Sequence, residues 1–159
     1  MARNVRGKKV STIVLGVGNP ILKDDSVGIK VARWLKERLP SVEVVETAEA
    51  GLTLLDFASG HDRLIIIDSI KTGEKGAIGE VSKLDFTTLD PAMDFTSFHG
   101  VDIVTAFELG KRLGYQMPQH VSVYAITVRD NLTFDENCSE ELEKKIPAIA
   151  LKILEEERL

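Results

Sequence analysis

The chain has 159 residues, a length that fits a single domain. Its formal net charge of -5 argues against a nucleic-acid-binding protein, which normally presents a basic face. The single cysteine, Cys138, excludes a disulfide framework and favours a reducing compartment, and no apolar stretch is long enough to span a bilayer. We therefore expect a cytoplasmic protein that neither enters a membrane nor binds nucleic acid.

Short apolar runs alternate with stretches of helical periodicity along the chain. After a loose tail at residues 1–9, the apolar runs predict strands at residues 10–17, 42–45, 64–68, 78–84 and 121–126. The third run is continuous in leucine and isoleucine until it reaches Asp68, which is typical of a strand covered on both faces. The run at 78–84 alternates and is flanked by glycine, so we place it near a sheet edge.

Helical periodicity fills the intervals between these strands. It predicts helices from residue 27 up to Pro40, over residues 51–59, over residues 103–113 and over a C-terminal segment. Asn137 and Glu140 resemble a capping box for the last helix, and Pro147 is expected to kink or restart it. The alternation predicts a single α/β domain of three layers. Its mainly parallel, twisted sheet has about five strands and carries helices on both faces.

Two aspartates follow strands of this predicted sheet. Asp25 comes after the first strand and its loop, and Asp68 closes the third strand. Ligands bind at the carboxyl edge of such sheets, and two carboxylates that share a crevice need a cation or a shared proton. At least one of Asp24, Asp25 and Ser26 is also expected to cap the helix that begins at residue 27. For Asp25 and Asp68 together, we favour a functional role.

A histidine can complete this set. His99 ends the long connection at residues 85–98, from which it can reach the carboxyl edge. Two carboxylates and one imidazole suit a borderline divalent ion such as zinc or nickel. His61 and His120 precede strands and are expected to point away from the crevice.

Other chemistries fit the residues less well. The glycines at 16 and 18 resemble the start of a dinucleotide fingerprint, but Ile21 stands where the third glycine belongs, and the nearby carboxylates would repel a pyrophosphate. No G-x-S-x-G elbow is present, and the acidic neighbours of Cys138 discourage a thiolate. Bond cleavage would therefore need a metal-activated water or a carboxylate base.

Three motifs resemble the endopeptidases that mature the large subunit of nickel–iron hydrogenases. The motifs are VLGVGNPILKDDSVG at residues 14–28, IIIDS at residues 65–69 and SFHGV at residues 97–101. The resemblance implies that Asp25, Asp68 and His99 contact the metal. It also implies a protease that recognises nickel already inserted in the hydrogenase precursor and removes a C-terminal extension in one cut. The nickel then belongs to the substrate, and zinc or another divalent ion can occupy the site in isolation.

The resemblance also implies residues that face the substrate. These residues are Gly18, Asn19, Glu49 and Gly51. Many family members carry Asp/Glu-x-Gly-Thr after the second strand, where this chain reads ETAEAG. The same metal ligands would also serve a nickel-dependent checkpoint chaperone that does not cut. They would serve a magnesium-dependent phosphohydrolase too, although magnesium sites seldom use an imidazole such as that of His99.

Overall fold

The computed structural model describes residues 9–49, 51–71, 76–86 and 103–159. Of the expected N-terminal tail, only Lys9 lies within these ranges. A five-stranded sheet in the order β2-β1-β3-β5-β4 runs through them. Its strands are β1 (Thr12–Val17), β2 (Glu43–Thr47), β3 (Arg63–Lys71), β4 (Val81–Asp85) and β5 (His120–Val128). All neighbouring pairs are parallel except β4 and β5, which confirms the predicted mainly parallel sheet.

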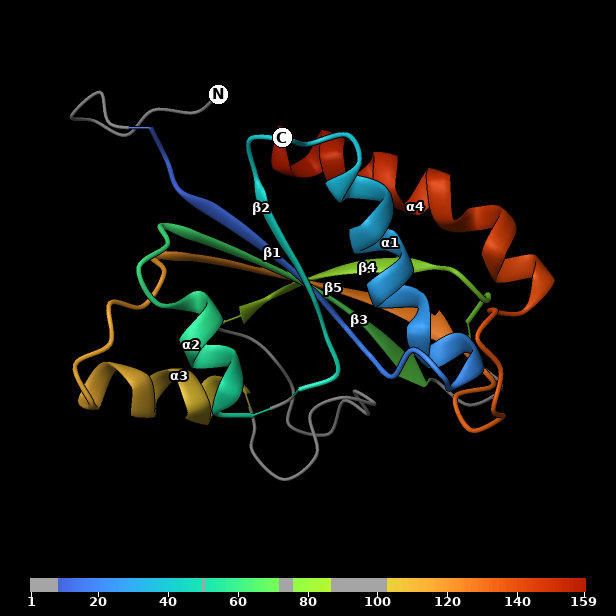
Figure 1. The fold of residues 1–159 in the computed structure, drawn as a ribbon, viewed down its shortest axis with the longest axis horizontal. Coiled ribbons are helices and arrows are strands. Elements are labelled where there is room, and N and C mark those ends of the chain that lie inside the picture. The colour runs from blue at the N-terminus through green and yellow to red at the C-terminus, as the bar shows by residue number, and fades with distance from the viewer. Residues whose placement is uncertain (1–8, 50, 72–75, 87–102) are drawn as a thin grey trace.

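Helices cover both faces of this sheet (Figure 1). They are the 3-10 helix η1 (Lys23–Ser26), and α1 (Val27–Lys36), α2 (Thr53–Ala58), α3 (Ile103–Arg112) and α4 (Glu140–Glu157). Helices α1 and α4 lie on one face, and α2 and α3 lie on the other. The predicted three-layer arrangement is therefore confirmed. No helix in the described part of the chain combines the length and the apolar character needed to cross a membrane.

The core is divided in two by the sheet. In β3, Ile65 and Ile67 belong to the core under α1 and α4, while Leu64 and Ile66 belong to the core under α2 and α3. Successive side chains of a strand point to opposite faces, so a strand buried on both sides must be apolar at every position. This accounts for the continuous leucine and isoleucine run.

Close contact between α1 and the sheet depends on glycine. A Cβ atom added at Gly28 would lie 2.4 Å from the carbonyl oxygen of Ile67 and 2.6 Å from that of Val17. A Cβ atom at Gly16 would lie 2.4 Å from the Cβ atom of Ala32. The start of α1 therefore packs directly on the carboxyl ends of β1 and β3. This packing accounts for Gly16 without a dinucleotide.

The start of α4 differs from the prediction. Ser139 is the N-cap, and Asn137 with Glu140 does not form the expected capping box because Glu140 is already the first helical residue. The backbone N–H of Cys138 instead donates to the Glu143 carboxylate over 2.9 Å. The helix is a single element through Pro147, so the expected restart there is wrong.

Candidate active site

Asp25 lies in η1, directly before α1, with 6% of its surface exposed. Its Oδ2 atom accepts the backbone N–H of Asn19 over 2.8 Å, and its Oδ1 atom accepts the hydroxyl of Ser69 over 3.0 Å. The loop before η1 folds back tightly, because a Cβ atom at Gly18 would lie 2.2 Å from the Asp25 carbonyl oxygen. Glycine at 18 therefore allows the loop to place the Asn19 N–H against the Asp25 carboxylate.

None of the acidic side chains of η1 caps α1 as expected. Ser26 is the N-cap, but no side-chain hydrogen bond caps the helix, and the Ser26 hydroxyl donates to the Lys23 carbonyl over 2.7 Å. The Asp25 carboxylate is directed toward the sheet and the loop by the two bonds described above. Asp25 therefore does not serve as a cap for α1.

Asp68 is fully buried, and it lies inside β3 rather than at its end, because β3 continues to Lys71. The ladder between β1 and β3 ends at the pair Gly16 and Ile67, whereas the ladder between β3 and β5 continues past Asp68, which pairs with Ala125. Asp68 therefore lies just beyond the last residue of β3 that pairs with β1. This position at the carboxyl edge of β1 is where ligands bind in open parallel sheets.

Ser69 contacts both carboxylates. Its hydroxyl donates to Asp25 Oδ1 over 3.0 Å, and its backbone N–H donates to Asp68 Oδ1 over 2.8 Å. Strand alternation directs Ser69 to the α1 face and Asp68 to the opposite face. Ser69 thus links the two aspartates at the carboxyl edge of the sheet. Ser69 ends the IIIDS motif, and the signal for its role in the sequence is a hydroxyl directly after a buried aspartate.

Two of the three predicted metal ligands, the carboxylates of Asp25 and Asp68, lie within the described ranges. No group of three or more His, Cys, Asp or Glu side chains gathers there in a way that could hold a metal ion. The third predicted ligand, His99, lies outside the described residues. Carboxylate oxygens bind divalent cations, and an added imidazole shifts the preference toward zinc or nickel. Metal binding by Asp25, Asp68 and His99 stays a prediction.

The residues expected to face substrate lie along the same edge. The Gly18 N–H donates to the carbonyl of Thr47 over 3.1 Å, which joins the loop after β1 to the end of β2. The Glu49 N–H donates to the hydroxyl of Thr47 over 2.9 Å, and the Glu49 side chain is exposed. Gly51, with a φ of 65°, follows at the start of α2. Substrate contact by Gly18, Asn19, Glu49 and Gly51 stays a prediction.

Residues 29–156 match the model of the hydrogenase maturation protease family. The chain belongs to this family. The match covers most of the protein and includes Asp68, whereas the Asp25 turn precedes it.

Named relatives agree with this assignment. The chain is similar to the hydrogenase 2 maturation protease of Escherichia coli K12, with 40% identity over 70 residues that make up 42% of either chain. It is 33% identical over 64 residues to the hydrogenase expression/formation protein HupD of Rhizobium leguminosarum bv. viciae. That match covers 38% of this chain and 32% of HupD. The chain thus spans less than half the length of these curated relatives.

Solved structures share the fold over nearly the whole chain. The hydrogenase maturating endopeptidase HybD from E. coli superimposes with a TM-score of 0.75 at 24% identity, covering 94% of this chain and 93% of HybD. A hydrogenase 2 maturation peptidase from a Thaumarchaeota archaeon gives a TM-score of 0.62 at 26% identity, covering 91% and 96%. The described strands and helices therefore form the fold of hydrogenase maturation proteases.

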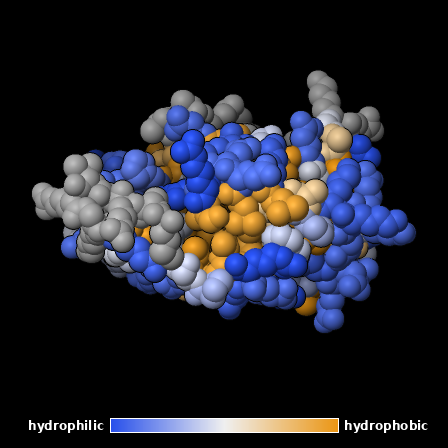
Figure 2. Space-filling model, turned by 90° about the horizontal axis from the view of Figure 1, so that it is seen from above, coloured by the Kyte–Doolittle hydropathy of each residue, from blue (hydrophilic) through white to orange (hydrophobic). Residues whose placement is uncertain are grey.

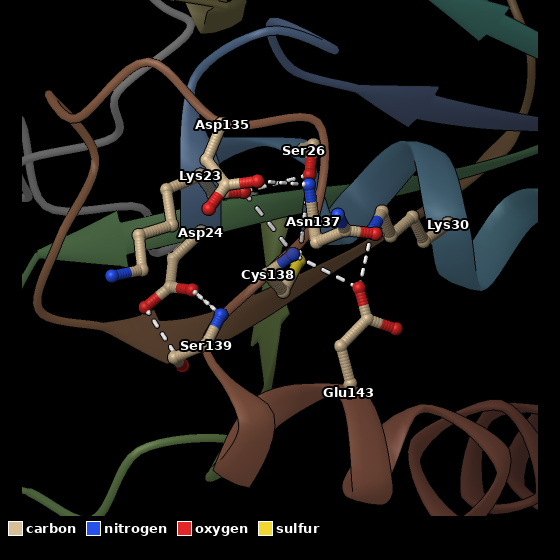
Figure 3. Close-up of polar contacts among 9 residues, drawn as sticks. All are labelled: Lys23, Asp24, Ser26, Lys30, Asp135, Asn137, Cys138, Ser139 and Glu143. Carbon is tan, nitrogen blue, oxygen red and sulfur yellow. Dashed lines mark hydrogen bonds and ion pairs between the residues drawn. The ribbon is translucent and has the colours of Figure 1, made fainter.

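In this family member, the Asp24 carboxylate points toward Ser139 at the start of α4 (Figure 3). Asp24 is fully buried, and its carboxylate accepts the Ser139 backbone N–H over 2.7 Å and the Ser139 hydroxyl over 3.2 Å. Beside it, the Cys138 sulfur lies 3.4 Å from the Ser26 hydroxyl. Burial raises the pKa of the Cys138 thiol, which keeps it protonated. Asp24 and Cys138 thus tie η1 to the start of α4.

The two described histidines lie at the opposite end of the sheet. His61 precedes β3, and its Nε2 atom lies 2.9 Å from a carboxylate oxygen of Glu43. His120 is the first residue of β5 and pairs with Arg63, the first residue of β3. Both histidines therefore belong to the amino ends of their strands, as expected.

Proposed function

We propose that this hydrogenase maturation protease family member is an endopeptidase. It recognises nickel in the precursor of a nickel–iron hydrogenase large subunit and removes the C-terminal extension of that precursor. The observation that supports this most is the pair of buried carboxylates, Asp25 and Asp68, linked by Ser69 at the carboxyl edge of β1. The family assignment supports the class of substrate.

The nickel in this proposal is part of the substrate. Two carboxylates held on one serine repel each other, and a divalent cation that arrives with the precursor relieves that repulsion. A carboxylate offers about four lone-pair positions, so the hydrogen bonds to Asp25 orient it and still allow it to act as a metal ligand. Asp25, Asp68 and His99 bind the nickel, and one of the aspartates also serves as a base for the attacking water. In the isolated protein, zinc or another divalent ion takes the same place.

The test is a cleavage assay on nickel-loaded precursor, followed by mass spectrometry of the precursor. Asp68→Asn and His99→Ala should leave the precursor at its full mass while circular dichroism shows an intact fold. Asp56→Asn is the matched control, because Asp56 is an exposed aspartate on α2. Processing by Asp68→Asn at the wild-type rate would overturn the proposal.

The same assay separates the endopeptidase from a checkpoint chaperone, which would use the same ligands. A chaperone would form a nickel-dependent complex with the precursor and leave its mass unchanged. The cytoplasmic location expected from cysteine usage stays a prediction alongside this function.

A further inference from the structure

Three large apolar side chains are exposed on two segments next to the Asp25 turn. Ile21 is 48% exposed, Leu132 is 72% exposed and Phe134 is 80% exposed. We call these three residues the apolar ridge. Single exposed apolar residues are common on protein surfaces, but a group beside a candidate active site marks a surface that another molecule covers.

The apolar ridge is held in place by backbone hydrogen bonds. Leu22 and Phe134 form an antiparallel bridge, the Lys23 N–H donates to the Thr133 carbonyl over 3.0 Å, and the Asp135 N–H donates to the Ile21 carbonyl over 3.0 Å. The two segments are thus fixed to each other. Ordering them on binding costs little entropy, so the exposed side chains are preorganised for a partner.

The turn before Phe134 is fixed as well. The Asp130 carboxylate accepts the Thr133 hydroxyl over 2.8 Å and the Thr133 backbone N–H over 3.0 Å. Hydrogen bonds from Thr133, the hydroxyl first, lower the pKa of Asp130 to about 2. Asp130 therefore stays ionised and closes this turn throughout the physiological pH range.

The same segment also contacts the residues that carry Asp25. The Asp24 N–H donates to the Asp130 carbonyl over 3.0 Å, and the Asp24 carboxylate accepts both donors of Ser139 (Figure 3). Asp24 directly precedes Asp25, the proposed metal ligand, in the chain. A polypeptide that lies on the apolar ridge therefore passes directly beside Asp25.

A hollow of about 450 Å³ opens next to the ridge. Its apolar lining comes from Pro20, Ile21 and Ile29. Its polar lining comes from Ser26, Lys30, Arg33, Glu136 and Asn137. The ridge thus joins a concave surface that an apolar side chain of a partner can enter. A different face, the one seen from above in Figure 2, carries an apolar area inside a border of hydrophilic residues.

We propose that the apolar ridge is the docking surface for the precursor protein that the enzyme cleaves, which rests on the proposed function. The small area of the ridge favours the precursor protein over a second copy of the chain as the molecule that binds there. One aromatic and two aliphatic side chains, each only partly exposed, present on the order of 400 Å² of apolar surface. A stable interface needs about 800 Å² from each partner. A substrate that binds, is cut once and leaves suits the smaller area.

The test removes the apolar character of the ridge and retains its backbone. In Leu132→Ser combined with Phe134→Ser, the KM for nickel-loaded precursor should rise on the order of tenfold to a hundredfold with kcat retained. The Kd for the precursor, measured in parallel, should rise by the same factor. Phe134→Leu should retain most of the affinity. Leu113→Ser is the control, because Leu113 is 63% exposed just beyond the end of α3.

The two measurements separate the inference from the proposed function. Unchanged KM and Kd in the double variant would overturn the docking surface, even where cleavage by the wild type is normal. If the wild type does not cleave the precursor but the double variant still binds it more weakly, the docking surface stands and only the proposed protease activity is wrong. A wild type that sediments as a dimer, with the double variant a monomer, would assign the ridge to a second copy and overturn the inference.

Discussion

Glu157 allows a quantitative prediction of stability against pH. It lies at the end of α4 with 6% of its surface exposed, and its partners belong to three strands of the sheet. Its Oε1 atom lies 2.7 Å from the Tyr124 hydroxyl and 2.8 Å from the Lys83 ammonium, and its Oε2 atom lies 2.5 Å from the Arg63 guanidinium. One carboxylate thus ties α4 to β3, β4 and β5.

The pKa of Glu157 gives the size of its contribution to the free energy of unfolding. Burial alone would raise this pKa, but hydrogen bonds from Lys83, Tyr124, Ser122 and Arg63 outweigh burial and lower it from 4.5 to about 2. Each pKa unit corresponds to about 1.4 kcal/mol, which gives about 3 kcal/mol at neutral pH. The Lys83 side chain is 42% exposed, so solvent screening reduces this to about 2–3 kcal/mol. Because the folded-state pKa is lowered, this stability is present above pH 4.5 and is lost as the pH falls toward 2.

Urea unfolding of Glu157→Gln at two pH values tests this reasoning. The variant should be about 2–3 kcal/mol less stable than the wild type at pH 7 and only about 1 kcal/mol less stable at pH 3. Glu155→Gln is the control, because Glu155 is an exposed carboxylate on the same turn and should change stability by less than about 0.5 kcal/mol. A difference between Glu157→Gln and the wild type that is equal at both pH values would refute the linkage argument.

Three further predictions concern the site and the packing around it. Ser69→Ala should lower kcat for precursor cleavage about tenfold, because Asp25 loses one orienting hydrogen bond, and Ser69→Thr should restore most of it in the same assay. Gly28→Ala should lower the free energy of unfolding by at least about 2 kcal/mol in urea, because its Cβ atom would meet the Ile67 carbonyl oxygen; an unchanged midpoint would contradict the close packing. Cys138 should react slowly with iodoacetamide at pH 8 until denaturant is added, because burial raises its pKa; rapid labelling of the folded protein would show that the thiol is accessible.

Much of the fold could be predicted from periodicity alone. Helix α1 begins at Val27 as expected, and β4 lies at a sheet edge. The error at the end of β3 comes from contact between distant parts of the chain. Strand β3 extends past Asp68 to Lys71 because β5 continues alongside it as far as Val128. A polar residue after an apolar run therefore does not mark the end of a strand when a neighbouring strand continues to pair beyond it.

The aspartates of the candidate site could be predicted from the sequence, but their contacts could not. Asp25 and Asp68 could be named because each follows an apolar run, a signal that lies within a few residues. The hydrogen bond from Ser69 to Asp25 could not be predicted, because these residues are 44 positions apart and meet only in the folded chain. The same holds for Asp24 and Ser139, which are 115 positions apart. His99 lies outside the described residues, so its place in the ligand set stays a prediction.

The position of the site follows from a difference in strand length. Strand β1 ends at Val17, while β3 continues to Lys71, so the edge of β3 beyond Ile67 no longer faces a β1 partner. A buried polar residue is costly within a fully paired, apolar strand, but here Asp68 has reached the edge of the sheet, where its neighbours include the Ser69 N–H. The glycines in β1 and α1 bring the start of α1 down onto the same edge, which lowers Asp25 to within reach of Ser69. The carboxylate pair is therefore a product of backbone packing. Substitutions that lift α1 from the sheet, such as Gly28→Ala, should separate the pair as well as destabilise the fold.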